Sequence, residues 1–259
     1  MYLSPIKSNS YLLIYTLLAL LLMGAVLPRP VYSGSWRVIP IRIDMDQRSR
    51  SGVVTIVNDS EEAIRFSVEA REWTQDQAGK DLYLETSDIL FFPKELIIDP
   101  NSERIIRTGI KVPATVKEKT YRLFIKQETA QRETPGTSVA IAIRFGVPIF
   151  AKPLNEQVSG EIVHLEVKDS KVNVAVKNSG NTHFRIQALK ILGKDVSGAS
   201  ILSQELNGGY LLNGSEKEFT FAILGDICTQ LNVMDIEVVT DRMQINGKAD
   251  VDKAMCLTP

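Results

Sequence analysis

The sequence predicts an all-β protein built from two immunoglobulin-like antiparallel β-sandwich domains. Three observations support this fold class. Apolar and polar residues alternate over short segments, turn residues separate these segments at intervals of about 8–15 residues, and no segment has a convincing helical period. Many short strands at this spacing are typical of a β-sandwich. The 259 residues suffice for two domains of about 100–150 residues each.

A targeting segment precedes the predicted strands. Lys7 lies in a short polar stretch, an unbroken apolar run extends from Tyr11 to Leu27, and Val31-Tyr32-Ser33 is an acceptable cleavage pattern. We therefore expect a signal peptide over residues 1–33, export across a membrane, and no stable membrane association after cleavage. A retained anchor is the alternative, because the apolar run is slightly long for a signal core, although it is also slightly short for a membrane span.

Composition excludes several classes of function. The chain is 44% hydrophobic and 24% charged, which is sufficient for folded cores. Lys and Arg number 30 against 31 Asp and Glu, so no basic excess indicates a nucleic-acid partner. The sequence has no nucleophile elbow, phosphate-binding loop or zinc-protease motif. We expect neither enzymatic activity nor a cofactor.

The first domain, residues 34–153, is predicted from about seven strand-like segments. They are Trp36–Met45, Val53–Val57, Ile64–Trp73, Asp88–Phe92, Leu96–Ile98, Arg104–Ile110 and a final pair of strands between Tyr121 and Pro153. Pro40 argues for a kink or an edge position in the first segment. Asn58-Asp59-Ser60 is a turn signal, and the segment from Thr74 to Asp81 is expected to be a polar loop.

The main functional prediction depends on the final pair of strands, between Tyr121 and Pro153. A polar loop over Thr129–Thr137 is followed by Val139, Ile141, Ile143 and Phe145, which a period of two places on one strand face. Such alternation is normally a half-buried strand within its own sheet. The other interpretation is that this strand is lent to a second protein, and the pattern alone leaves both open.

The second domain, residues 154–259, repeats the plan of the first. Residues 54–70 and 172–188 each read as a strand, a turn containing asparagine and a second strand, at an offset of about 120 residues. Chance similarity between strands is the alternative. Further strands are expected at Ile186–Leu192, Glu218–Ile223 and Val233–Thr240, with a turn at Gly208-Gly209 and a final hairpin around Asn246-Gly247.

The two cysteines and two histidines limit which disulfides and metal sites the chain can form. In an exported protein, the pair Cys228 and Cys256 indicates a disulfide, with two free buried thiols as the alternative. Neither His164 nor His183 lies at a ligand spacing from a cysteine, so we expect no metal site. Both histidines are expected on strand surfaces.

Residues 36–153 resemble a known family in the order of their segments. These segments are SWRVIPIRIDMD, SGVVTIVND, EWTQDQAGKD, TSDILFFPKELIIDP, ERIIRTGIKVP, TYRLFIK and VAIAIRFGVPIFAKP. They resemble periplasmic pilus-assembly chaperones of the chaperone–usher system. The GVPIF ending resembles the archaic branch, which serves spore-coat-U-like subunits. The second domain matches mainly in length and strand content.

The resemblance implies a fold arrangement and a mechanism. The two domains would form a boomerang with an interdomain cleft, in the periplasm. The chaperone would fold and cap secreted pilin-type subunits that lack a final strand, and deliver them to an outer-membrane usher. It would do so by donor-strand complementation, because an open sandwich exposes unpaired edges. The alternative is an exported structural or adhesive subunit built from immunoglobulin-like domains.

The resemblance also implies site residues. The donor positions are Val139, Ile141 and Ile143, with Phe145 as a further position. The family holds the subunit's terminal carboxylate with two bases. The first corresponds to Arg42, whereas the second, usually a lysine, falls on Pro148. We expect Arg144 to substitute for that lysine, and Lys152 to be an interdomain salt-bridge base.

Overall fold

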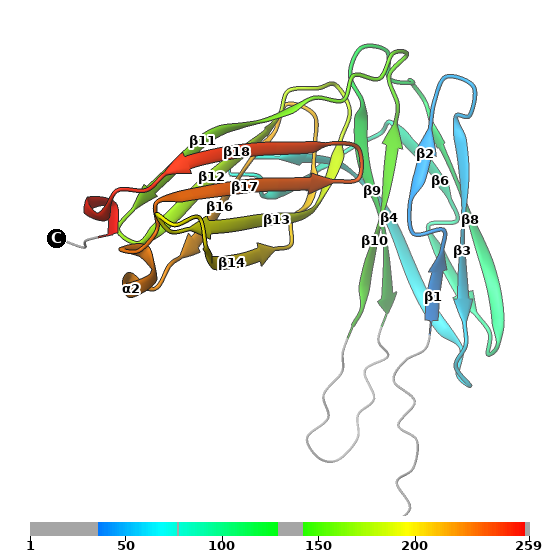
Figure 1. Ribbon diagram of the computed structural model, residues 1–259. Helices are drawn as coiled ribbons and strands as arrows, with labels where there is room; N and C mark the ends of the chain where they lie inside the picture. Colours follow the sequence, from blue (N-terminus) through cyan, green and yellow to red (C-terminus); the bar gives the residue numbers. More distant parts are fainter. Residues whose placement is uncertain (1–35, 77, 129–141, 257–259) are drawn as a thin grey trace, which may run out of the picture. The chain divides into compact units, whose positions relative to one another are not determined.

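The structure is a computed structural model that describes residues 36–76, 78–128 and 142–256, all within one compact unit, Trp36–Pro259 (Figure 1). The expected signal peptide, residues 1–33, lies outside the described residues, as do the donor positions Val139 and Ile141. In the described part of the chain, no helix has the length and apolar character needed to cross a membrane. Buried and less buried residues alternate along several of the strands described below, including Ser51–Asn58 and Val233–Thr240.

The first sandwich consists of two sheets. Its four-stranded sheet has the order β1-β3-β8-β6, and its six-stranded sheet has the order β2-β10-β9-β4-β5, with β7 also paired to β4. The strands are β1 (Trp36–Ile39), β2 (Ile43–Met45), β3 (Ser51–Asn58), β4 (Ile64–Gln75), β5 (Asp81–Glu85), β6 (Ile89–Phe92), β7 (Glu95–Ile98), β8 (Ser102–Ile110), β9 (Lys119–Glu128) and β10 (Arg144–Ala151). The two-sandwich, all-β prediction is thus confirmed for the first half.

The predicted first strand, Trp36–Met45, is divided between the two sheets. The chain leaves one sheet after Ile39 and enters the other at Ile43, so Pro40 lies where the strand crosses over. β1 pairs with β3 in antiparallel fashion, whereas β2 pairs with β10 in parallel. Proline has no N–H to give to a ladder, which explains why the pairing is interrupted at this position.

The second sandwich also has two sheets, of three and five strands. Their orders are β11-β12-β16 and β14-β13-β17-β18, with β15 also paired to β13. The elements are β11 (Gly160–Lys168), β12 (Lys171–Asn178), β13 (Phe184–Lys194), β14 (Ser200–Leu206), β15 (Gly209–Leu211), β16 (Glu216–Ala222), α2 (Gly225–Cys228), β17 (Val233–Thr240), β18 (Gln244–Asp250) and η1 (Lys253–Cys256).

A disulfide joins the two short helices of the second sandwich. Cys228 at the end of α2 and Cys256 at the end of η1 are bonded, with their Cα atoms 5.6 Å apart. Both residues are buried in the second core. The predicted disulfide is therefore confirmed.

The last hairpin differs from its prediction. Asn246 and Gly247 lie inside β18, opposite Glu237 and Ile236, and the turn instead falls between Thr240 and Gln244. The Thr240 hydroxyl accepts hydrogen bonds from the backbone N–H groups of Arg242 and Met243, at 3.1 and 2.8 Å. Side-chain capping of the turn thus outweighs the Asn-Gly signal.

The predicted repeat is visible where each sandwich passes from one sheet to the other. β3 and β4 belong to different sheets, and so do β12 and β13. Asn58 ends β3 and Asn178 ends β12, and both side chains are fully buried. Each asparagine Nδ2 donates to backbone carbonyls of its own sandwich, including that of Ile98 for Asn58 and that of Leu211 for Asn178.

Candidate functional site

The apolar face of β10 extends beyond the core of its own sandwich. Val147 and Ile149 are 0% exposed within that core, and Phe145 is partly buried against it. Ile143, which immediately precedes β10 and continues the same face, is 42% exposed. Its carbonyl still accepts a hydrogen bond from Gln127 N at 2.9 Å, so the backbone remains paired with β9. Ile143 is a paired apolar residue that the first core does not cover.

The opposite face of the same sheet carries three arginines, Arg71, Arg122 and Arg144, called here the arginine face. Residues Arg71, Arg122 and Pro148 are cross-strand neighbours on β4, β9 and β10. Arg144 is the first residue of β10. Adjacent cations on one sheet face repel each other unless carboxylates neutralise them.

Two of the three arginines, Arg71 and Arg144, form ion pairs with the carboxylates of Glu69 and Glu85. Arg71 forms ion pairs with Glu69 and Glu85, at 2.9 and 3.2 Å. Arg144 also forms an ion pair with Glu69, and its guanidinium carbon lies 3.5 Å from the centre of the Phe124 ring. Burial raises the pKa of Glu69, but hydrogen bonds from both arginines lower it more, so the net shift is downward. Glu69 therefore stays ionised between them.

Arg122 has a different environment. Its guanidinium carbon lies 3.9 Å from the centre of the Trp73 ring, and Nη1 donates to Gly146 O at 3.0 Å. Its buried Nε has no hydrogen-bond partner, and within the described residues no carboxylate forms an ion pair with Arg122. A Cβ at Gly146 would lie 2.9 Å from the Phe124 ring, so glycine makes room there for side chains of β9.

Arg42 lies in the segment that crosses between the two sheets. Its Nε donates to Asp44 Oδ2 at 2.8 Å, and its guanidinium carbon is 5.7 Å from the centre of the Phe150 ring. Burial lowers the pKa of Arg42, but the hydrogen bond and charge of Asp44 raise it more, and Tyr210 adds to that upward shift. The guanidinium is therefore charged and half exposed, beside Tyr210.

An aromatic cluster links Arg42 to Arg122. Trp73, Phe150 and Tyr210 form it, with ring centres 5.4–5.9 Å apart. Arg42 lies over Phe150, and Arg122 lies over Trp73 and 5.9 Å from the centre of Tyr210. Aromatic faces attract guanidinium groups, which explains why each of the two cations lies against a ring of this cluster.

His183 is not on a strand surface, as the sequence had suggested, but buried. Its ring stacks on Phe150 with 3.5 Å between centres. Its Nδ1 and backbone N both lie 2.8 Å from Glu118 Oε2, and the Thr182 hydroxyl donates to Oε1 at 3.2 Å. A carboxylate that is 0% exposed must be paired in this way. His164, by contrast, lies on the surface of β11, as predicted.

Lys152 follows β10 and takes part in a small ion-pair network. Its Nζ lies 3.3 Å from Glu156 Oε1, and Glu156 Oε2 accepts a hydrogen bond from Arg242 at 2.9 Å. The hydrogen bond from Arg242 is the main cause of the lowered pKa of Glu156, with a further contribution from Lys152. Its role as an interdomain base stays a prediction.

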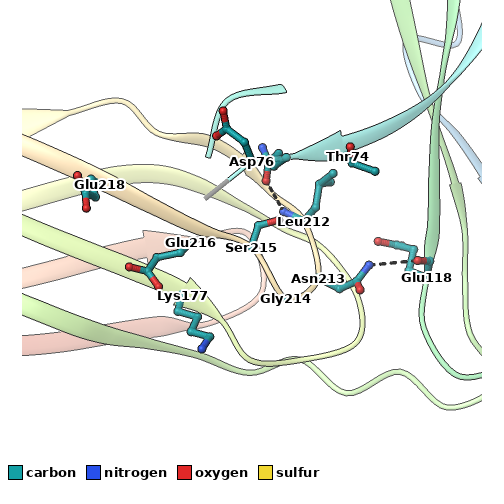
Figure 2. A pocket seen from close by; sticks show the side chains of 11 residues that line it. Thr74, Asp76, Glu118, Lys177, Leu212, Asn213, Gly214, Ser215, Glu216 and Glu218 are labelled. Atoms are coloured by element: carbon teal, nitrogen blue, oxygen red, sulfur yellow. Dashed lines mark hydrogen bonds between the residues drawn. The ribbon is translucent and has the colours of Figure 1, made fainter. Parts of the chain in front are cut away.

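Figure 2 shows residues that line a hollow, whose volume is about 750 Å³. Arg71, Arg122 and Arg144 are not among the residues that line it. Its lining includes four carboxylates against a single cation, Lys177. The carboxylates belong to Asp76, Glu118, Glu216 and Glu218. A hollow with this charge balance does not suit an anionic ligand. Nor could any group of three or more His, Cys, Asp and Glu hold a metal ion in the described part of the chain.

Sequence reasoning missed Arg122, although a signal was present. Arg122 interrupts the apolar run between Tyr121 and Ile125 on a strand predicted to be half buried. A charged residue at such a position has to be paired or functional. The partner that would have identified its role, Trp73, lies in another strand and cannot be inferred from spacing.

Residues 36–157 match the family described as pili and flagellar-assembly chaperone, PapD N-terminal domain. No curated protein matches the sequence. Solved structures match over most of the chain. The complex of CsuC with the tip adhesion subunit CsuE, from archaic chaperone–usher Csu pili of Acinetobacter baumannii, matches with a TM-score of 0.58 and 18% identity, covering 83% of this chain and 97% of that one.

Two further structures share the fold. The CupB2 chaperone of Pseudomonas aeruginosa has a TM-score of 0.51 at 14% identity, covering 83% of this chain and all of that one, 100%. The Salmonella enterica SafA pilin in complex with the SafB chaperone has a TM-score of 0.50 at 13% identity, covering 84% and 97%. At these identities the likeness shows two β-sandwiches of the same architecture.

Proposed function

We propose that this chain caps subunits by donor-strand complementation. The premise is that the chain belongs, through residues 36–157, to the PapD-like pili and flagellar-assembly chaperone family. Membership of a chaperone family confirms that the chain is not an enzyme. On this proposal, the chain is exported to the periplasm, holds a pilin-type subunit that lacks its final strand, and passes it to an outer-membrane usher. The archaic resemblance makes spore-coat-U-like subunits the expected class.

The proposal rests on how the exposure of apolar side chains changes along β10 and the residue before it. Its core-facing series passes from fully buried Ile149 and Val147 to Ile143, which is 42% exposed yet still paired through its backbone. An apolar strand face without a cover in its own core fits the groove of an incomplete sandwich, whose edges need partners. The donor series Val139, Ile141, Ile143 and Phe145 continues this face along the sequence.

The proposed anchor for the subunit's terminal carboxylate is Arg42. Its guanidinium is charged, half exposed and held by Asp44 and Phe150, so its position is defined before a ligand arrives. An arginine can donate two parallel hydrogen bonds to a carboxylate. Arg144 remains a second proposed anchor, and Lys152, through Glu156, a proposed interdomain base.

The test replaces the exposed part of the series. In Ile141→Asp/Ile143→Asp, the free chaperone should melt within a few degrees of the wild type, because Ile143 contributes little to its own core. A co-expressed candidate subunit should then be lost from the soluble fraction, since charge would enter an apolar groove. Thermal unfolding and co-purification are the two measurements.

Two matched controls define the outcome. Ile149→Asp lies on the same face but inside the core, and should unfold the free protein. Ile105→Asp is at an exposed position of another sheet, at 41% exposure, and should retain the subunit. A double variant that melts far below the wild type would place these residues in the chaperone's own core and contradict the proposal.

A further inference from the structure

We infer that Pro148 ends strand addition along the open edge of β10 and thereby sets the register of the strand that pairs there. The inference rests on the proposed function and deepens it, because it names a residue that determines where the bound polypeptide pairs. β9 covers one side of β10 along its whole length, whereas β2 pairs on the other side only with residues 149–151. Residues 144–148 therefore form an edge without a partner strand among the described residues, called here the open edge.

Backbone groups of alternate β10 residues point to the open edge. Ile143 O accepts a hydrogen bond from Gln127 N at 2.9 Å, so the residues at odd positions pair with β9. On the other side, Lys152 N donates to Met45 O at 2.8 Å, so the residues at even positions face the side of β2. The even residues of the open edge are Arg144, Gly146 and Pro148.

Pro148 removes the donor at the inner end of the open edge. Proline has no N–H, so a strand added here finds donors at Arg144 and Gly146 and none at position 148. The carbonyl of Gly146 already accepts a hydrogen bond from Arg122 Nη1 at 3.0 Å. Pro148 is also buried, so a carbonyl placed opposite it would be shielded from water without a donor. Pairing of an added strand therefore ends at Gly146.

This stop removes an ambiguity that the side-chain pattern leaves. A slip of one residue turns every apolar side chain of an added strand to the wrong face, but a slip of two residues restores the faces. Alternation alone therefore permits registers two residues apart. A strand that advanced by two residues would place a carbonyl opposite Pro148, where it has no donor. Pro148 thus excludes a register that alternation would allow.

The experiment follows hydrogen exchange of the β10 amides by NMR, with and without a peptide. The probe is an acetylated and amidated peptide in which valine and threonine alternate, because a repeating sequence has no preferred register of its own. In the wild type, the peptide should slow exchange at Arg144 and Gly146. In Pro148→Ala, the new amide at position 148 should exchange freely without the peptide and slowly with it. The peptide should bind this variant about 2- to 10-fold more tightly, as one added hydrogen bond predicts.

A matched control removes a proline elsewhere in the same sandwich. Pro100→Ala changes an exposed turn and should leave peptide affinity and β10 exchange as in the wild type. Thermal unfolding of each variant excludes misfolding as the cause. Pro148→Val restores the same N–H with a residue that favours strands, and it replaces Pro148→Ala if that variant does not fold.

The outcomes separate this inference from the proposed function. If Arg144 and Gly146 are protected but the new amide at position 148 is not, another feature ends the pairing and the inference is overturned. If the peptide protects neither Arg144 nor Gly146 in the wild type, the open edge takes no strand, and the inference is overturned as well. Co-purification of a candidate subunit with the wild type would in both cases leave the proposed function standing.

Discussion

The two sandwiches share a buried asparagine corner but use the loop after it differently. Asn58 and Asn178 each end a strand and tie the following loop to their own sandwich through side-chain hydrogen bonds. In the first sandwich the loop residues after the corner, Glu61 to Ala63, are exposed. In the second, Thr182 and His183 in the corresponding loop are buried against Glu118.

The difference shows how one structural unit acquires a second task. The asparagine satisfies backbone groups at the sheet-to-sheet corner in both sandwiches, so its role is internal. The loop beyond it is free to vary. In the second sandwich it supplies the groups that hydrogen-bond to Glu118 and stack on Phe150. It thereby connects the second sandwich to Glu118, just before β9, and to Phe150 in β10.

The largest expected effect concerns the disulfide, which only the second sandwich has. Cys228→Ser/Cys256→Ser should lower the free energy of unfolding of that sandwich by about 3–4 kcal/mol, because the bond closes a loop with a sequence separation of 28. Urea unfolding followed by circular dichroism should show the second sandwich melting first. A reductant should change the wild type but not the variant. Unchanged unfolding of the variant would contradict the prediction.

The corner asparagines should give the next largest effect. Asn58→Ala and Asn178→Ala should each destabilise their own sandwich by about 2–4 kcal/mol, because two or three buried carbonyls lose their donor. Asn246→Ala, at an exposed position of β18, is the matched control and should be nearly neutral. Equal, small effects at all three positions in urea titrations would show that the corners do not stabilise the sandwiches.

The smallest expected effect is a pH-dependent contribution of Asp88 to the stability of the first sandwich. The Tyr121 hydroxyl donates to Asp88 at 2.9 Å, and this bond, together with Lys119, lowers the pKa of Asp88. A carboxyl whose pKa is lower in the folded state stabilises the protein above its unfolded pKa, and loses that contribution as the pH falls through the folded value.

Asp88→Asn should therefore lower the free energy of unfolding by less than about 1 kcal/mol at neutral pH, since the side chain is partly exposed and screened by solvent. The difference from the wild type should shrink as the pH falls through the lowered folded pKa of Asp88, and it should vanish once Asp88 is protonated in both states. Unfolding measured by urea at a series of pH values checks this. A difference that persists at low pH would mean that packing, not charge, is responsible.

Much of the fold could be predicted from the sequence because it depends on local alternation. Ile64, Phe66 and Val68 alternate in the sequence and all face the first core. β5 was missed, because its residues are mostly exposed and only pairing with β4 makes it a strand. Pro40 predicts only a kink or an edge position, since nothing local indicates that the strand continues in another sheet.

The candidate site was less predictable, because long-range pairing defines it. Glu118 and His183 are 65 residues apart in sequence, and neither shows a local sign of its partner. Arg122 and Arg144 look alike in the sequence, as single cations on alternating strands. Only the position of Glu69, beside Arg144 and Arg71, distinguishes them.

The aromatic cluster has a consequence for dissecting this protein into fragments. Trp73 and Phe150 come from the first sandwich, whereas Leu212, buried with them, comes from the second. A fragment ending near residue 157 would expose both aromatic rings to water and leave the carboxylate of Glu118 without its donors. Such a fragment would tend to self-associate through the new apolar surface. Properties measured on either half alone would therefore describe that cut surface, so variants of the intact chain are the sound basis for assigning roles.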